Sequence, residues 1–208
     1  MRDKKIWIFN AGNAFDGNPK WLFMYIVNYR KDITPYWFCY TEEARDYIRK
    51  LGYQVFLFKS KMAEKIGSQA GVYVVNQKKE IFQDYLKGIT VLNLWHGVGC
   101  KTVEKGVTYG FLNERIIKKH IINMDCYQNY QLFLVTSPLM EKHFIKQCDL
   151  AEDKIIRAGY PCCFYPGKIK TYDHDILKQK KLPEDTKIAV YAPTYRDASA
   201  TNFFSQAI

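Results

Sequence analysis

Short apolar runs alternate along this chain with segments of helical spacing, and this alternation limits the possible folds more than any other feature. The runs are continuous, rich in β-branched and aromatic residues, and occupy residues 5–10, 35–40, 53–58, 72–75, 89–95 and 131–136. Continuous apolar runs are typical of strands buried on both faces of a parallel sheet. The helical segments between them supply the crossovers that parallel pairing requires. The sequence therefore predicts an α/β fold of Rossmann-like type, with a mainly parallel sheet and helices on both faces.

The first helix is expected from Lys20, after a loop at residues 11–19 that is too rich in Gly, Asn and Asp to continue the first strand. Asn18 is predicted as the N-cap of this helix, and Pro19 as a residue of its first turn. The free amides near Gly17 and Asn18 are suited to hold a phosphate. An ordinary capped helix is the alternative interpretation of the same pattern. Further along, Ser137 is predicted to cap a later helix.

The apolar run at residues 89–95 ends in a histidine, His96, followed by Gly97 and Gly99. Ligands of α/β folds bind beyond the carboxyl ends of the strands, where glycine lets the backbone approach a substrate. The imidazole of His96 is expected at such a position, and imidazole titrates close to neutral pH, as a general base requires. A histidine that only satisfies a neighbouring carbonyl is the structural alternative.

Basic residues outnumber acidic ones by 31 to 21, which gives a formal net charge of +10. Such a charge favours polyanionic partners: a nucleic acid, an anionic membrane face or a phosphate-rich substrate. The basic residues are scattered and no zinc-finger or RNP pattern is present, so we expect no nucleic acid. One local basic cluster is either a solvated face or a contact with anionic lipid. It consists of Arg115, Lys118, Lys119 and His120.

The six cysteines lack the CxxC spacing of a metal site, so we expect reduced thiols, no metal and no cofactor. No charged segment followed by an apolar stretch opens the chain, and no apolar run approaches the roughly 18 residues of a membrane span. Any membrane contact is therefore expected to be peripheral.

Three stretches divide the chain. Residues 1–161 are predicted to form an N-terminal Rossmann-like domain, and residues 162–186, irregular and rich in Lys, Pro and Asp, to form a linker. A new apolar strand is expected at residues 188–191 with no later partner in the sequence. Residues 187–208 are therefore predicted to be the start of a second, truncated Rossmann-like domain.

Four short motifs resemble those of the CDP-glycerol glycerophosphotransferase family of teichoic acid and capsule polymer synthesis. In chain order they are Gly17-Asn18-Pro19-Lys20, Leu94-Trp95-His96-Gly97, Gly159-Tyr160-Pro161 and Tyr191-Ala192-Pro193-Thr194-Tyr195-Arg196-Asp197. The resemblance implies a GT-B-like enzyme with two Rossmann-like domains. The first would face a polymer or lipid-linked acceptor, and the second would hold CDP-glycerol or a related CDP-polyol donor. A polyol phosphate would be transferred to a hydroxyl of the polymer, and CMP would be released.

The resemblance also implies roles for individual residues. His96 occupies the position of the proposed base of the family. Arg196 is expected to clasp the donor pyrophosphate, with Thr194 adding a hydroxyl donor, whereas a surface ion pair with Asp197 is the alternative for Arg196. The residues expected to bind substrate are Gly17, Asn18, Lys20, Gly97, Thr194 and Arg196. The resemblance places the protein in the cytoplasm, peripherally bound at the inner face of the cell membrane.

The chain departs from the family at Cys162 and Cys163, where Arg-Asn-Asp or a similar sequence is common, so no role is carried past Pro161. The donor-binding half of the family is expected beyond residue 208, and this chain alone is expected to be inactive. Two other functions stay open. One is a GT-B glycosyltransferase that uses a nucleotide sugar, since fold does not fix function. The other is a non-catalytic module that binds an anionic polymer or membrane.

Overall fold

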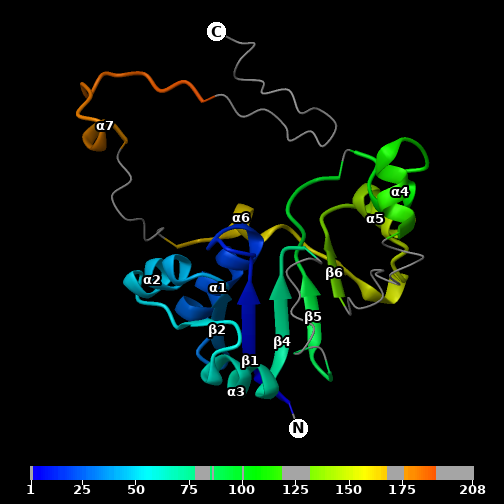
Figure 1. The fold of residues 1–208 in the computed structure, drawn as a ribbon, viewed down its shortest axis with the longest axis horizontal. Coiled ribbons are helices and arrows are strands. Elements are labelled where there is room, and N and C mark those ends of the chain that lie inside the picture. The colour runs from blue at the N-terminus through cyan, green and yellow to red at the C-terminus, as the bar shows by residue number, and fades with distance from the viewer. Residues whose placement is uncertain are drawn as a thin grey trace. The chain divides into compact units, whose positions relative to one another are not determined.

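The computed structural model describes residues 2–77, 85, 87–99, 101–118, 132–167 and 176–190. Within these ranges seven strands form one sheet, and every neighbouring pair is parallel. Their order, β3-β2-β1-β4-β5-β6-β7, is that of a doubly wound Rossmann-type sheet (Figure 1). The strands are β1 (Asp3–Asn10), β2 (Thr34–Cys39), β3 (Val55–Leu57), β4 (Ala70–Val75), β5 (Thr90–Asn93), β6 (Leu132–Val135) and β7 (Ile155–Arg157). The predicted fold class is confirmed.

Helices lie between most of the strands of the described chain, as parallel crossovers require, although none is described between β4 and β5. They are α1 (Gly17–Tyr29), α2 (Glu42–Lys50), α3 (Lys61–Gln69), α4 (Phe111–Ile117), α5 (Pro138–Cys148), α6 (Pro161–Phe164) and α7 (Ile176–Gln179), with 3₁₀ turns η3 (Glu104–Gly106) and η6 (Glu152–Lys154). Ser137 caps α5 as predicted, because its hydroxyl accepts a hydrogen bond from the Met140 amide at 3.2 Å. None of the described helices is both long enough and apolar enough to traverse a bilayer.

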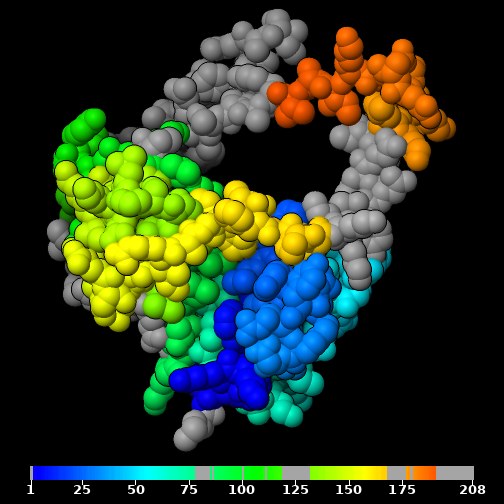
Figure 2. All heavy atoms as spheres, turned by 180° about the vertical axis from the view of Figure 1, so that it is seen from behind, coloured from blue at the N-terminus to red at the C-terminus, as the bar shows by residue number. Residues whose placement is uncertain are grey.

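The contacts of the chain divide it into two compact units, Met1–Lys168 and Ile169–Ile208. The sheet and α1 to α6 belong to the first unit, and α7 belongs to the second. In the first unit α6 packs against α1 (Figure 2, yellow against blue). The short helix α6 therefore returns the chain from the last strand of the sheet to its first helix.

The strand expected at residues 188–191 is not formed in the described part, which reaches residue 190. Residues 188–190 have no regular structure, and Ile188 and Val190 are 56% and 83% exposed. A strand needs a neighbour to pair its backbone hydrogen bonds, and these residues take no part in the sheet. The predicted borders of the domains and the linker stay predictions.

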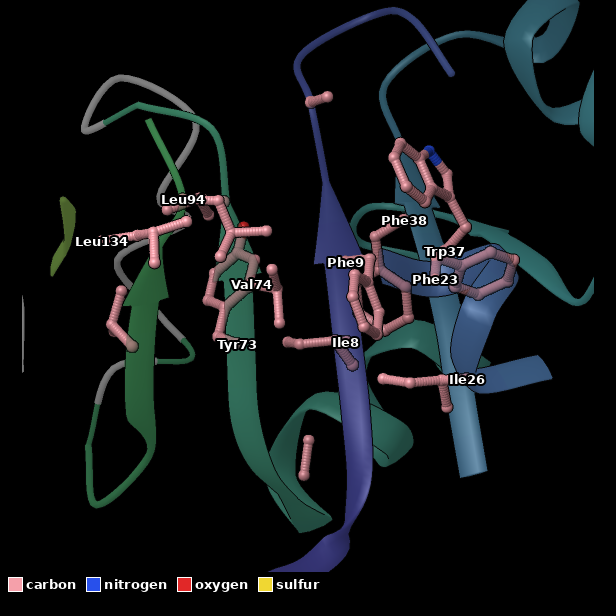
Figure 3. Packing of buried hydrophobic residues seen from close by; sticks show 14 of the residues in the cluster. Ile8, Phe9, Phe23, Ile26, Trp37, Phe38, Tyr73, Val74, Leu94 and Leu134 are labelled. Atoms are coloured by element: carbon pink, nitrogen blue, oxygen red, sulfur yellow. The ribbon is translucent and has the colours of Figure 1, made fainter. Parts of the chain in front are cut away.

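The sheet is buried on both faces, which explains why its strands read as continuous apolar runs. Ile8 and Phe9 are neighbours in β1 and point to opposite faces, yet neither is exposed. On one face Phe9 and Trp37 pack edge-on against Phe23 of α1, with ring centroids 5.4 and 5.6 Å away (Figure 3). Phe38, next to Trp37, is equally buried on the other face. This core fixes the strands whose ends form the candidate site.

Candidate functional site at the carboxyl edge of the sheet

All the strands of the described sheet run in one direction, so their carboxyl ends meet along one edge, the upper edge in Figure 1. In a doubly wound sheet, the crevice where ligands bind lies at this edge, where the strand order reverses. Here the reversal falls between β1 and β4. The start of α1 follows β1, and the loop that carries His96 follows β5, the strand next to β4. The first two motifs therefore converge where such folds bind ligands.

His96 lies three residues beyond the end of β5, and its side chain is exposed, as the sequence predicts. Its ring stacks on Trp95 at a centroid distance of 4.3 Å and an interplanar angle of 23°. Trp95 is only 9% exposed and packs against Phe133 and Phe144, at 5.5 and 5.0 Å. The imidazole thus rests in solvent on an indole that is anchored in the core.

The backbone around His96 is held from several sides. The Leu94 amide donates to the Val75 carbonyl at 2.9 Å, which extends the β4–β5 pairing by one bond. Trp95 then adopts a φ of +55°, an uncommon conformation for a bulky side chain. Its amide donates to the Asn93 side-chain oxygen at 2.9 Å. The chain turns sharply at Trp95, and this turn brings His96 out of the sheet.

Asn18 does not cap α1, and this prediction was wrong. The N-cap is Asp16, whose side chain makes no capping hydrogen bond. Asn18 lies inside the first turn, is 4% exposed, and donates to the carbonyls of Trp95 at 2.8 Å and Leu94 at 3.3 Å. Its oxygen accepts from the Cys162 amide at 3.4 Å. These partners are distant in the sequence, so a local capping pattern could not reveal them.

Gly17 and Lys20 flank Asn18 at the start of α1. Gly17 has a φ of +61°, and a Cβ atom there would lie 2.7 Å from the amide nitrogen of Asn76. The Lys20 ammonium lies over the rings of Trp21 and Phe15, at 5.1 and 5.5 Å from their centroids. The motif therefore combines a tight backbone turn with a cation held on an aromatic surface.

Gly97, directly after His96, has open space around it, since nothing lies within 4 Å of the position of a Cβ atom. Its carbonyl accepts a hydrogen bond of 2.6 Å from the Tyr160 hydroxyl. Tyr160 is 8% exposed, and burial raises the pKa of its phenol. Sequence reasoning gave Tyr160 no role, although its motif follows β7 and so had to lie at this same edge.

The remaining predicted donor-site residues, Thr194 and Arg196, lie outside the described residues. Of the basic cluster, Arg115 and Lys118 are described and exposed, whereas Lys119 and His120 are also outside the described ranges. Across the described part of the chain, no three His, Cys, Asp or Glu side chains gather to hold a metal ion.

Solved structures with this fold include several of the wall teichoic acid polymerase TagF. One, of a variant soaked with CDPG, has a TM-score of 0.67 at 18% sequence identity and covers 94% of this chain and 49% of that chain. A second variant gives 0.66 at 19% identity, and a structure titled simply as the polymerase gives 0.64 at 18%, with the same coverage. The chain spans about half the length of these structures. No curated protein matches the sequence significantly.

The doubly wound parallel sheet and its similarity to TagF define the chain as a Rossmann-like unit of the GT-B-like kind. The sequence profile of a family described as CDP-Glycerol:Poly(glycerophosphate) glycerophosphotransferase matches residues 1–208. The chain belongs to this family.

Proposed function

We propose that this chain provides the acceptor side of an enzyme that transfers glycerol phosphate, or a related polyol phosphate, from a CDP-activated donor to a hydroxyl of a growing polymer. The observation that carries the proposal is the exposed His96 at the carboxyl end of β5, in the Leu94–Gly97 motif that carries the resemblance to the family. An exposed imidazole on a fixed backbone suits proton transfer with an incoming alcohol.

In the proposed reaction, His96 accepts the proton of the acceptor hydroxyl. At the same time the oxygen of that hydroxyl attacks the phosphorus of the glycerol phosphate group. The bond between that phosphorus and the bridging oxygen breaks, and CMP leaves with the electron pair. Charge on the phosphoryl oxygens needs fixed cations or amides. We assign this task at the donor to Arg196 and Thr194, as the resemblance implies, because guanidinium and hydroxyl groups are effective phosphate donors.

We assign the acceptor to the surface around Gly17, Lys20 and Gly97. The first turn of α1 contains no acidic residue, and Asp16 leaves its amides without a side-chain cap. Amides at a helix N-terminus and a nearby ammonium group favour a phosphate of the polymer. The open space at Gly97 would let the acceptor hydroxyl reach the imidazole.

We place a peripheral contact with the inner face of the membrane at α4. Arg115 in this helix and Lys118 directly after it are exposed, and so are nearby apolar side chains, since Ile117 is 43% and Tyr109, before the helix, is 85% exposed. Basic residues beside exposed apolar ones suit an anionic lipid surface. Such a contact would bring a lipid-linked acceptor to the enzyme.

The test is to incubate the complete protein and a polymer or lipid-linked acceptor with CDP-glycerol, CDP-ribitol and UDP-sugars, and to measure nucleotide release. We expect CMP release with a CDP-polyol and no UDP release with the UDP-sugars. UDP release would favour the nucleotide-sugar transferase instead. Binding of anionic polymer without any nucleotide release would favour the non-catalytic module.

A further inference from the structure

The loop that carries His96 needs support from outside itself. Trp95 has a φ of +55°, and a bulky residue keeps such a conformation only where its surroundings enforce it. The β4–β5 pairing ends at the Leu94 amide, so the sheet does not reach His96. Whatever orients the imidazole must therefore come from other parts of the first unit.

Two side chains from distant segments donate hydrogen bonds to the backbone on either side of the histidine. The Asn18 amide, from α1, donates to the Trp95 carbonyl at 2.8 Å, on the amino side. The Tyr160 hydroxyl, between β7 and α6, donates to the Gly97 carbonyl at 2.6 Å, on the carboxyl side. The two carbonyls held in this way belong to the residues immediately before and after His96.

Both side chains are buried and suited to this task. The two amide hydrogens of Asn18 have acceptors in the Trp95 and Leu94 carbonyls, and its oxygen accepts from the Cys162 amide. Burial raises the pKa of the Tyr160 phenol, which keeps the hydroxyl protonated as a donor. Since Cys162 follows Tyr160 by two residues, the two supports are also joined to each other.

We propose that Asn18 and Tyr160 are positioning residues that together fix the peptide on both sides of His96 and so aim its imidazole at the acceptor hydroxyl. The inference rests on the proposed function, in which His96 is the base. It replaces direct substrate binding as the role of the Asn18 side chain, because both hydrogens of this buried side-chain amide already have acceptors.

The chain offers a matched control for a purely structural role. Asn10 ends β1, is fully buried, and donates to the carbonyls of Phe38 at 2.9 Å and Gly12 at 3.2 Å. Its oxygen accepts from the Gly12 amide at 3.2 Å. Asn10 thus has the same burial and the same kinds of bonds as Asn18, but these bonds do not involve the His96 loop.

The test is a double-mutant cycle in the complete protein. Tyr160→Phe and Asn18→Asp are each measured alone and in a His96→Ala background, with Asn10→Asp as the control. Tyr160→Phe removes one hydroxyl, and Asn18→Asp keeps the shape but removes both donors. We expect kcat to fall by up to about 100-fold, since a small misplacement of a catalytic group has this effect, with KM nearly unchanged.

In the His96→Ala background we expect neither change to lower the residual turnover further, because no base remains to be aimed. Turnover is followed over long incubations with radiolabelled donor, and the melting temperature is recorded for every variant. Asn10→Asp should lower the melting temperature and leave the kcat of the folded protein near wild type. Tyr160→Phe decides the outcome if Asn18→Asp fails to fold.

Wild-type kcat in Tyr160→Phe, or an equal fractional loss with and without His96, would overturn the positioning role. These results leave the proposed function intact if His96→Ala alone strongly lowers turnover. Wild-type turnover in His96→Ala would instead overturn the proposed base, and the positioning role with it. The single variant and the cycle therefore distinguish the two failures.

Discussion

At the scale of single residues, Trp95 connects the hydrophobic core with the proposed base, His96. Its indole ring contacts Phe133 and Phe144 in the core, and it also stacks with the ring of His96. The positive φ at Trp95 turns the next side chain out of the sheet into solvent. Backbone strain of this kind costs about 1–3 kcal/mol and is found where function requires a fixed geometry. The imidazole is therefore exposed without being loosely held.

His96→Ala should lower turnover by about 100- to 10,000-fold, the usual contribution of a general base. Binding of CDP-glycerol should stay near wild type, because the donor is assigned to residues such as Arg196. Steady-state CMP release and equilibrium binding of the donor separate the two effects. His143→Ala is the control, because this half-buried histidine lies on α5 and is not the proposed base. Equal losses in both variants would contradict the assignment of the base.

Gly17→Ala should destabilise the first unit more than Gly12→Ala does. Both glycines have positive φ, +61° and +67°, so both variants carry the backbone cost of roughly 1 kcal/mol for a left-handed residue. Only at Gly17 would the new Cβ atom meet a neighbour, the Asn76 amide at 2.7 Å, whereas Gly12 has nothing within 4 Å. Urea denaturation of the two variants measures the difference. Equal free energies of unfolding would mean that Asn76 moves aside without cost.

At the scale of elements, α5 packs against the His96 loop, since its Phe144 contacts Trp95. The N-cap of α5 can be tested separately. Ser137→Ala removes the hydroxyl that accepts from the Met140 amide and should cost about 1 kcal/mol of stability. Ser68→Ala is the control, because this exposed hydroxyl in α3 only donates to the Lys65 carbonyl. Thermal unfolding of both variants decides the point, and an equal effect would contradict a special role for the cap.

Elements defined by local patterns were predictable, and those defined by distant partners were not. The apolar run before Ala11 and the Ser137 cap report their structure within a few residues, and both are confirmed. Asn18 carries an equally good local capping signal, but its bonds to Trp95 and Cys162 span 77 and 144 residues. Such bonds depend on the tertiary fold and override local preference. The same limit hid Tyr160 as the support of Gly97.

At the scale of the whole molecule, the strand order explains why the first three motifs lie at one place. The chain builds outward from β1 to β3, then crosses back to β4 and continues to β7. The ends of β1 and β5 and the segment after β7 then meet at one edge, although β1 and β7 are separated by most of the first unit in sequence. An α/β pattern read from the sequence predicts this edge, because ligand sites of such sheets lie at the reversal. It does not predict which side chains bond there.

The proposed lipid contact belongs to the scale of the whole molecule, because the net charge of +10 could by itself attract anionic lipid. Binding is then either local to α4 or a general property of the basic protein. The double variant Arg115→Glu with Lys118→Glu should weaken binding to anionic vesicles, since each basic residue near such a surface contributes about 1 kcal/mol. Lys61→Glu with Lys65→Glu changes the charge equally on exposed residues of α3 and should have a smaller effect. Co-sedimentation with phosphatidylglycerol and phosphatidylcholine vesicles, at low and high salt, measures both. The same loss in the two double variants would contradict a contact at α4, because overall charge would then account for the binding.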